Sequence, residues 1–285
     1  MRQKSIGLFI NSIAGGGKAI TLARKVSARL TALEINHVWI LDNWPEESDE
    51  FSEIWIFGGD GTLNYFINKY PEIKLPLVMF SGGTGNDLSW KINRNIATED
   101  FLVELLESKS FSVDAGRCNG RLFLNGVGIG FDGEVLKSIN SIRYFGGHLG
   151  YLIAVIQNIF TFRERKFSLS FNHIKIDQKY LLLFIGNSSR TGGGFHISPL
   201  AEIDDGLLDL ILVDPLSPMK RLFYLPKIEK GRHLTLDITA HHTLQSIKIQ
   251  CDGICPAQID GELIHSDLFD IEILPKHFNF KTVML

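Results

Sequence analysis

Short apolar runs alternate with amphipathic segments through the first third of the chain. Such runs, bounded by turn residues, are typical of buried strands, and apolar residues spaced three and four apart indicate helices with one buried face. Helices are expected from the glycines at 15–17 through Leu30 and at 65–70, and strands at Ser5–Ile10, His37–Leu41, 54–57 and 77–80. This alternation predicts an open α/β domain on a parallel sheet.

After about residue 111 the pattern changes to short strands separated by glycines and turns. Many short strands of this kind are typical of a β-sandwich. The change predicts two domains, which a length of 285 residues accommodates. A charged helix is expected at 98–108, further helices at 132–138 and 147–160, and strands at 112–117, 122–130, 167–176, 180–187, 207–213, 234–240, 246–250 and 268–274.

Three of the predicted parallel strands are each followed by a glycine-rich polar loop. These loops cover residues 11–18, 58–64 and 81–88. Glycine lets a backbone approach a ligand closely, and the N–H groups at the start of a helix carry partial positive charge that attracts phosphate. Because open α/β sheets bind ligands at the carboxyl ends of their strands, the three loops predict a phosphate-binding site.

The first loop matches neither common phosphate fingerprint. A Walker A loop needs glycine in place of Ser12 and Ser or Thr in place of Ala19. Its three glycines are contiguous, whereas the dinucleotide fingerprint spaces them. The loop is still expected to contact phosphate through its backbone.

Several carboxylates in turns admit two interpretations from the residues alone. Asp60 lies between glycines and either binds a metal or hydroxyl group or stabilises its own turn. Asp205 belongs either to a turn or to a site for Mg²⁺, which prefers oxygen ligands. Glu262 follows Asp260 and Gly261 in what reads first as a hairpin turn.

The composition excludes some classes of protein. Hydrophobic residues make up 45% and charged residues 21% of the chain, which is typical of a globular enzyme and argues against disorder. The net charge of −3 provides no basic field for nucleic acid, so nucleic acid is not expected as a partner.

The chain is expected to be cytoplasmic. The apolar segment 149–160 is shorter than the roughly 20 residues that cross a bilayer, and no cleavage site follows the mildly basic N-terminus. Cys118, Cys251 and Cys255 form no pairing framework, which suits a reducing compartment. The apolar segment and the basic residues after it indicate either a buried core helix or a lipid entry surface against anionic headgroups.

Two motifs carry a family resemblance. The runs Gly58-Gly59-Asp60-Gly61-Thr62-Leu63-Asn64 and Gly83-Thr84-Gly85-Asn86-Asp87 together resemble the diacylglycerol kinase catalytic domain, which bacterial diacylglycerol kinases and other lipid kinases share with the related sphingosine kinases. The resemblance extends over nearly the whole chain. Further motifs follow in the family's order at 11–18, 187–194, 199–201, 204–209 and 260–262.

The resemblance implies a doubly wound, parallel-sheet nucleotide-binding domain followed by a β-sandwich domain. The ATP-binding α/β domain would comprise residues 1–124, with 275–285 returning to it, and the β-sandwich domain with the lipid-substrate and base residues would comprise 125–274. ATP phosphates would bind at the turn 58–64. The implied nucleotide contacts are Asn11, Gly58, Gly59, Asp60, Gly61, Thr62, Asn64, Thr84, Asn86 and Asp87.

The same resemblance implies the catalytic and metal-binding groups. Glu262 would be the general base, supported by Asp260, while Asp60 would position phosphate and metal. Phosphoryl transfer to an alcohol uses such a carboxylate together with Mg²⁺, so ATP and Mg²⁺ are the expected cofactors. A structural Mg²⁺ site would be formed by Asp205 with backbone oxygens near Glu202 and Leu207.

The sequence departs from the family pattern in three places. Ser12 replaces a usual proline, and Ser81 with Gly82 replaces a Pro-Leu pair, but neither change removes a functional group. The connection between the strands at His37–Leu41 and 54–57 is shorter than the usual helical one. The adenosine contacts in that connection are therefore left undefined.

The sequence thus predicts an ATP- and Mg²⁺-dependent kinase of phospholipid biosynthesis that phosphorylates diacylglycerol or a similar long-chain lipid alcohol. Its partners would be ATP and a lipid substrate at a membrane surface, with which it would associate peripherally; a homodimer is left open. One alternative is a soluble-substrate kinase of the NAD kinase type, which shares the Gly-Gly-Asp-Gly-Thr core. The other is a non-catalytic, nucleotide-responsive binding protein.

Overall fold

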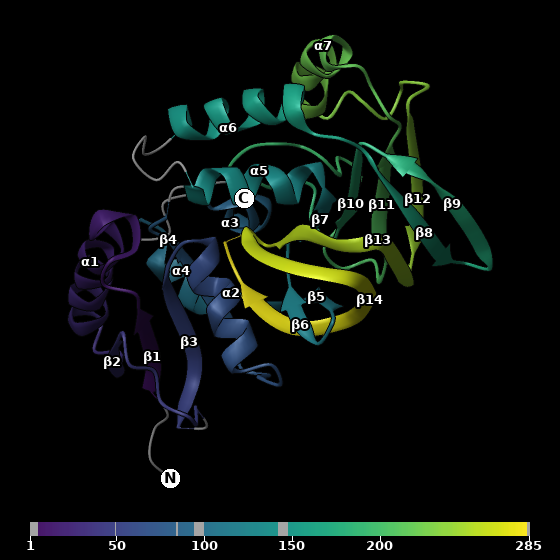
Figure 1. Cartoon of the computed structure of the whole chain (residues 1–285). Coiled ribbons are helices and arrows are strands. Elements are labelled where there is room, and N and C mark those ends of the chain that lie inside the picture. Colours follow the sequence, from purple (N-terminus) through teal and green to yellow (C-terminus); the bar gives the residue numbers. More distant parts are fainter. Residues whose placement is uncertain (1–4, 49, 84, 94–99, 142–147, 284–285) are drawn as a thin grey trace. The chain divides into compact units, whose positions relative to one another are not determined.

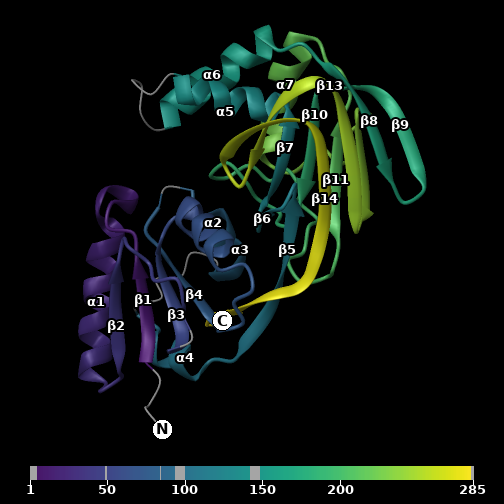
Figure 2. The same cartoon turned by 60° about the horizontal axis from the view of Figure 1, so that its bottom comes forward.

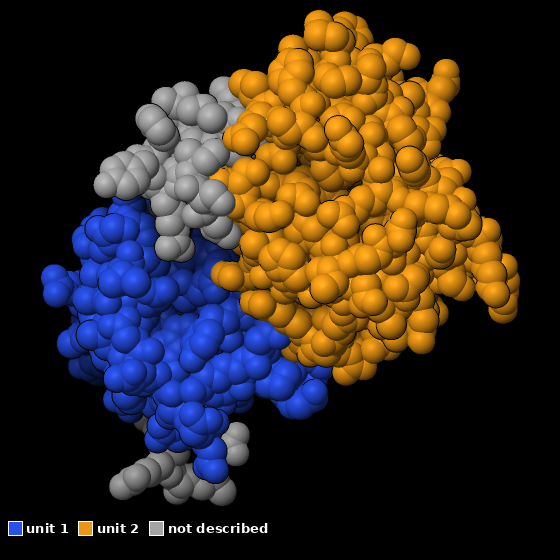
Figure 3. Space-filling model, in the orientation of Figure 1, with its two compact units in different colours: residues 1–114, 276–285 blue, residues 115–275 orange. Residues whose placement is uncertain are grey.

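The computed structural model describes residues 5–48, 50–83, 85–93, 100–141 and 148–283 (Figure 1). The chain divides into two compact units (Figure 3). The first unit contains residues 1–114 and 276–285, and the second contains residues 115–275. The domain boundary expected after residue 124 stays a prediction.

The first unit is built on a parallel sheet in the order β2–β1–β3–β4 (Figure 2). The end of β14 joins this sheet beside β4, where Phe280 pairs with Leu77. The strands are β1 (Ser5–Ile10), β2 (His37–Leu41), β3 (Phe51–Gly58), β4 (Leu77–Ser81) and β14 (Glu262–Lys281). The parallel sheet and its first four strands are therefore confirmed.

Helices cover both faces of the parallel sheet. Successive strand residues point to opposite faces, so Leu8 packs with α1 and α4 while Phe9 packs edge-on against Phe66 of α2, with 5.6 Å between ring centroids. This arrangement confirms the doubly wound architecture. The helices are η1 (Ala14–Gly16), α1 (Lys18–Ala32), α2 (Asp60–Lys69), α3 (Asp87–Asn93) and α4 (Leu102–Glu107).

The second unit is a β-sandwich-like domain whose strands enclose one large apolar core. Phe167, Leu210 and Phe269 of this core are almost fully buried. The described strands are paired in the order β12–β11–β10–β7–β13–β14, and the β8–β9 hairpin pairs with β13. The expected sandwich class is confirmed.

The bounds of the remaining elements are as follows. The strands are β5 (Ser110–Cys118), β6 (Arg121–Phe123), β7 (Gly126–Gly130), β8 (Arg165–Phe171), β9 (Ile174–Tyr180), β10 (Leu182–Gly186), β11 (Leu208–Val213), β12 (Thr239–Leu244) and β13 (Ser246–Ile259). The helices are α5 (Phe131–Ser141), α6 (His148–Thr161) and α7 (Pro218–Glu229).

Some expected elements were wrong. The strand at 167–176 is a hairpin, because Asn172 and His173 adopt positive φ angles of 46° and 63° and turn the chain between β8 and β9. The strand at 234–240 is instead β12, which begins at Thr239 after a turn. Helix α7 was not expected, since Pro226 in its interior masks the helical pattern.

Helix α7 is attached to the end of α6 by one buried arginine. The Arg221 side chain is 7% exposed, and its Nη1 donates to the carbonyl oxygens of Ile159 at 2.8 Å and Phe162 at 3.0 Å. Its Nη2 donates to Glu164 Oε1 at 2.6 Å. A cation at a helix C-terminus is favourable because the last carbonyls carry partial negative charge, so Arg221 both neutralises Glu164 and fastens the two helices together.

A buried ion pair holds the last strand in the sheet of the first unit. Lys281 Nζ lies 2.7 Å from Glu53 Oε1 and donates to the Leu106 carbonyl oxygen at 3.2 Å. Trp55 Nε1 donates to the other Glu53 oxygen at 3.0 Å. The lysine side chain is 5% exposed and that of Glu53 is 19% exposed, so the charge of Lys281 depends almost wholly on these protein partners.

We expect Lys281→Met to lower the free energy of unfolding of the first unit by about 3 kcal/mol, because the largely buried charge of Glu53 would lose its counter-charge. The double variant with Glu53→Gln should recover part of this loss. Urea denaturation measures both. Lys69→Met is the control: its partner Glu46 is 91% exposed, and a loss below about 1 kcal/mol is expected. Equal losses in the two lysine variants would contradict this account.

Candidate active site

The three glycine loops of the first unit lie against one another at the carboxyl ends of β1, β3 and β4. A Cβ atom on Gly83 would lie 2.5 Å from Gly59 Cα, and one on Gly15 would overlap the Gly82 carbonyl oxygen. The Gly82 N–H donates to the Gly58 carbonyl oxygen at 2.7 Å. Only residues without a Cβ atom permit this close approach, which explains why glycines occur in all three loops.

Side-chain hydrogen bonds fix the loops further. Asn11 Nδ2 donates to Thr62 Oγ1 at 3.0 Å and so joins the first loop to the second. Within the third loop, Asn86 Oδ1 accepts from the Gly83 N–H at 3.2 Å, and Asn86 Nδ2 donates to the Gly83 carbonyl oxygen at 3.0 Å. The polar residues between the glycines therefore hold the loop backbones in place.

Asp60 links the second loop to the third. Its carboxylate oxygens accept hydrogen bonds from the backbone N–H groups of Asp87 at 3.1 Å and Leu88 at 3.4 Å, at the start of α3. The turn-stabilising interpretation of Asp60 is thus present, although the helix it stabilises is α3. Gly59, the N-cap of α2, has no side chain to bond the first N–H groups of that helix, so they suit an anion.

A hollow of about 320 Å³ adjoins the first two loops. Ile13 and Tyr65, which are 82% and 56% exposed, line it together with Trp44, whose ring centroid is 5.4 Å from that of Tyr65. Asp42 Oδ1 and Oδ2 accept hydrogen bonds from the N–H and Oγ of Ser12, and these bonds lower the pKa of Asp42. Sequence reasoning missed this hollow; its signal was the aspartate at the end of a parallel strand.

In the second unit, Asp260 holds a loop by its backbone. One carboxylate oxygen accepts from the N–H of Leu124 at 2.8 Å, and the other accepts from those of Asn125 and Gly126, both at 2.9 Å. The φ angles of Asp260 and Gly261 are 47° and 84°, which are typical of a two-residue type I′ hairpin turn.

Glu262 follows that turn and is exposed. It pairs with Ile259 at the first position of β14, so the hairpin turn expected from the sequence is confirmed. Since the Asp260 oxygens are already bonded to three amides, Asp260 supports Glu262 by fixing the turn that precedes it.

Gln258 connects the same turn to a buried carboxyl group. Its Oε1 accepts from the Gly261 N–H at 2.7 Å, and its Nε2 donates to Asp132 Oδ2 at 2.9 Å. Burial raises the pKa of Asp132 to about 6, because this single side-chain hydrogen bond compensates the lost hydration only in part. Neither Asp132 nor Gln258 was expected from the sequence, since they lie far apart along the chain.

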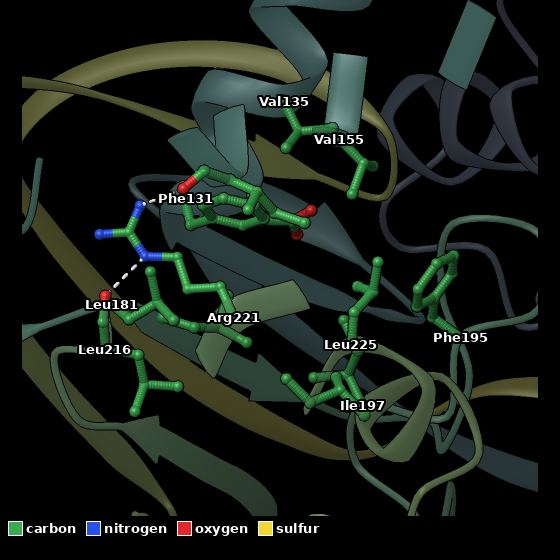
Figure 4. Close-up of a pocket in the computed structure, with 13 residues that line it drawn as sticks. Phe131, Val135, Val155, Leu181, Phe195, Ile197, Leu216, Arg221 and Leu225 are labelled. Atoms are coloured by element: carbon green, nitrogen blue, oxygen red, sulfur yellow. Dashed lines mark hydrogen bonds between the residues drawn. The ribbon is translucent and has the colours of Figure 1, made fainter. Parts of the chain in front are cut away.

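Asp132 lies where two hollows of the second unit meet. One hollow extends from Gly261 and Thr191 to Phe195. The other, of about 60 Å³, is lined almost wholly by apolar side chains (Figure 4). Its lining comes from α5, α6, α7 and the adjoining strands: Phe131, Val135, Val155, Ile159, Leu181, Leu182, Phe195, Ile197, Leu216, Leu225 and Ile228, with the polar residues Asp132 and Arg221.

The expected metal ligands lie on the loop before β11. Glu202 and Asp205 are exposed, and Asp205 Oδ1 accepts from the Leu207 N–H at 3.0 Å. Burial, and to a lesser degree the charges of Asp205 and Glu202, raise the pKa of Asp209. The donor set of one carboxylate and backbone oxygens fits Mg²⁺ in kind. Among the described residues, no group of three or more His, Cys, Asp or Glu side chains gathers as a metal site.

Asn64 and Thr84 are the two remaining residues that the sequence predicts to contact the nucleotide. Asn64 is 2% exposed inside α2, where Asn68 Nδ2 donates to its carbonyl oxygen at 2.9 Å. Thr84 lies outside the described residues.

Within the part of the chain that the structure describes, no helix is both long and apolar enough to span a membrane.

Two family models match consecutive parts of the chain. The diacylglycerol kinase catalytic domain matches residues 5–118, and the YegS C-terminal NAD kinase beta sandwich-like domain matches residues 125–281. The second match alone covers more than half of the 285 residues.

Individual proteins agree with the family models. A diacylglycerol kinase of Mycobacterium tuberculosis is 26% identical over 273 residues, which cover 89% of this chain and 88% of the relative. A protein of Shewanella frigidimarina named probable lipid kinase YegS-like is 25% identical over 239 residues, which cover 82% of this chain and 77% of the relative. A crystal structure described as that of a putative diacylglycerol kinase from Bacillus anthracis is 26% identical and has a TM-score of 0.79; the match covers 98% of this chain and 95% of the solved one.

The two family models thus match consecutive parts of the chain, and the solved structure shares its fold. The chain belongs to the diacylglycerol kinase family of lipid kinases.

Proposed function

We propose that this protein uses ATP to phosphorylate the hydroxyl group of diacylglycerol or a similar long-chain lipid alcohol. The observation that carries the proposal is the polar turn that ends in Glu262, which adjoins a hollow leading to an apolar cavity past Asp132. Glycine loops suit any phosphate donor, whereas an apolar cavity beside a carboxylate favours an acceptor with a hydrocarbon chain.

The first unit would bind ATP. The N–H groups at the start of α2 would bind its phosphates, because they are uncapped and carry partial positive charge. The hollow lined by Trp44 and Tyr65 would take the base, since a flat aromatic group packs well against such rings. Asp60 lies beside the phosphate position and would contribute an oxygen ligand to Mg²⁺, which neutralises phosphate charge when bound.

The second unit would supply the general base. Glu262 would accept the proton of the lipid hydroxyl as the new O–P bond forms and the bond between the γ-phosphorus and ADP breaks. Asp260 would act as a positioning residue through the loop at Leu124–Gly126. A weakly held Mg²⁺ at Asp205, with backbone oxygens of Glu202 and Leu207, would stabilise the neighbouring loop.

The apolar cavity would take the first part of an acyl chain. Its volume of about 60 Å³ is too small for a whole long chain, so α6 and α7 would have to move outward when the chain enters. The acceptor would reach the protein from a membrane surface, to which the enzyme would bind peripherally. The headgroup would lie near Asp132 and Gly261, at the junction of the two hollows.

Incubation with labelled ATP, Mg²⁺ and a lipid extract tests the function directly. Mass spectrometry should detect a new phosphorylated lipid, and ATP should be consumed with lipid micelles but not with NAD. Consumption with NAD alone would instead support the soluble-substrate alternative. ATP binding without any phosphorylated product would support the non-catalytic one.

We expect Glu262→Gln to lower kcat by at least about a hundredfold, because the amide cannot accept the hydroxyl proton. Its melting temperature and its affinity for ATP should match those of the original protein, since Glu262 is exposed. Asp252→Asn, which also removes an exposed carboxylate from the second unit, should retain full activity. An unchanged kcat in Glu262→Gln would refute its assignment as the base.

Asp132→Asn should stabilise the protein at neutral pH. Because the pKa of Asp132 is raised from 3.8 to about 6, the fold disfavours the charged carboxylate, and this cost is absent below about pH 4 and complete above about pH 6. The variant should therefore gain up to about 3 kcal/mol at pH 7.5 and almost nothing at pH 4. Thermal unfolding at the two pH values measures the difference; an equal gain at both would contradict the assigned cause.

A further inference from the structure

Two adjacent helices of the second unit carry exposed apolar side chains on their outer sides as well as buried ones on their inner sides, as far as the structure describes their side chains. In α7, the inner residues Leu225 and Ile228 line the apolar cavity, whereas Met219 and Phe223 on the outer side are 68% and 67% exposed. A surface helix of a globular protein normally has one apolar face and one polar face. The outer apolar side of α7 therefore indicates a surface that binds a partner.

Helix α6 continues the same surface. Its outer residues Ile156 and Phe160 are 40% and 54% exposed, while Val155 and Ile159 of its inner side are almost fully buried at the cavity. Figures 1 and 2 both show α6 beside α7, and Arg221 joins them. We call the outer apolar residues the α6–α7 face: Ile156, Phe160, Met219, Leu222 and Phe223.

Basic side chains surround this face. Arg163, Lys220 and Lys230 are exposed beside it. Lys227 Nζ lies 5.3 Å from the ring centroid of Phe223, so its stem covers the aromatic ring while its charge stays in water. Of the neighbouring acids, Glu164 is neutralised by Arg221, whereas Glu229 at the end of α7 is exposed, so basic side chains outnumber the unpaired acid. Apolar side chains ringed by lysine and arginine complement an anionic lipid surface.

The apolar cavity on the inner side of α6 and α7 favours a membrane over a protein as the partner of the α6–α7 face. The same two helices carry the α6–α7 face on one side and the apolar cavity lining on the other. A lipid that leaves a bilayer at this face would need to pass only between α6 and α7 to enter the cavity. A protein partner would explain the exposed face but not its continuity with an internal apolar space.

We infer that the α6–α7 face binds the surface of an anionic bilayer and admits the lipid substrate between the two helices. This inference rests on the proposed function for the identity of the lipid as substrate. The binding itself requires only the exposed apolar residues and their basic surround.

Vesicle sedimentation of the full-length protein tests the binding step. The protein should bind vesicles of phosphatidylcholine with about 30% phosphatidylglycerol at least about tenfold more strongly than vesicles of phosphatidylcholine alone. The variant Met219→Ser/Phe223→Ser should lose at least about tenfold of its affinity for the anionic vesicles. Lys220→Gln/Lys227→Gln should lose most of the preference for them.

Ile254→Ser is the matched control. Ile254 is 69% exposed, like Phe223, but lies on the bulge of β13, so its variant should bind vesicles as the original protein does. Unchanged binding in Met219→Ser/Phe223→Ser, or no binding of the original protein to either vesicle, would overturn the inference. Melting temperatures should be unchanged, because the substituted side chains are exposed.

Activity assays separate this inference from the proposed function. The variant Met219→Ser/Phe223→Ser should phosphorylate diacylglycerol in anionic vesicles at least about tenfold more slowly, yet retain the original rate with a short-chain, water-soluble diacylglycerol. If the original protein phosphorylates neither substrate, the proposed function fails, while the vesicle measurements still decide the binding. Equal slowing with both substrates would place the defect away from the membrane and overturn the inference.

Discussion

The site in the second unit depends on one carboxylate that is saturated by backbone amides. Asp260 accepts hydrogen bonds from Leu124, Asn125 and Gly126 and thereby fixes the tip of the β13–β14 hairpin against the start of β7. Because both of its oxygens are engaged, the turn has one orientation, and Glu262 follows it at a defined position. Glu262 itself is exposed, whereas the buried carboxylate of Asp260 provides the rigidity of the turn.

The first unit achieves the same rigidity with backbone contacts. Its loops touch where Gly59 meets Gly83 and where Gly15 meets Gly82, and only residues without a Cβ atom allow these backbones to approach so closely. Asp60 then joins two loops through the first amides of α3. The turn-stabilising interpretation of Asp60 is therefore present in the structure, and the proposed contact with Mg²⁺ would use a carboxylate whose orientation these two bonds already fix.

The buried carboxyl group of Asp132 and the exposed apolar side chains of α6 and α7 contribute unfavourably or not at all to the stability of the fold. Burial disfavours the charged form of Asp132, and exposed side chains such as Phe223 gain nothing from the fold itself. Such features persist where they serve a ligand. Their positions, at the junction of two hollows and on the outside of the cavity, agree with a single path for a lipid.

The sequence by itself determined the features that depend on neighbouring residues. Apolar runs set the strands of the parallel sheet, glycines set the loops after them, and Asp260 with Gly261 set a hairpin turn, because these conformations follow from local sterics and spacing. The order of the motifs was enough to identify the family. The hairpin at Asn172 and the helix around Pro226 were missed because tertiary packing overrode weak local signals there.

Only the tertiary structure decided which partners each polar group has. Asp60 bonds amides from the third loop, Gln258 reaches Asp132 from a distant part of the chain, and Arg221 fastens α7 to α6. Contacts between residues so far apart in sequence produce no periodic pattern of residue types along the chain, because they depend on how strands and helices pack. The sequence therefore defined the carboxylates and glycines of the predicted loops and turn, whereas packing added Asp132 and Gln258 and decided which partners each group has.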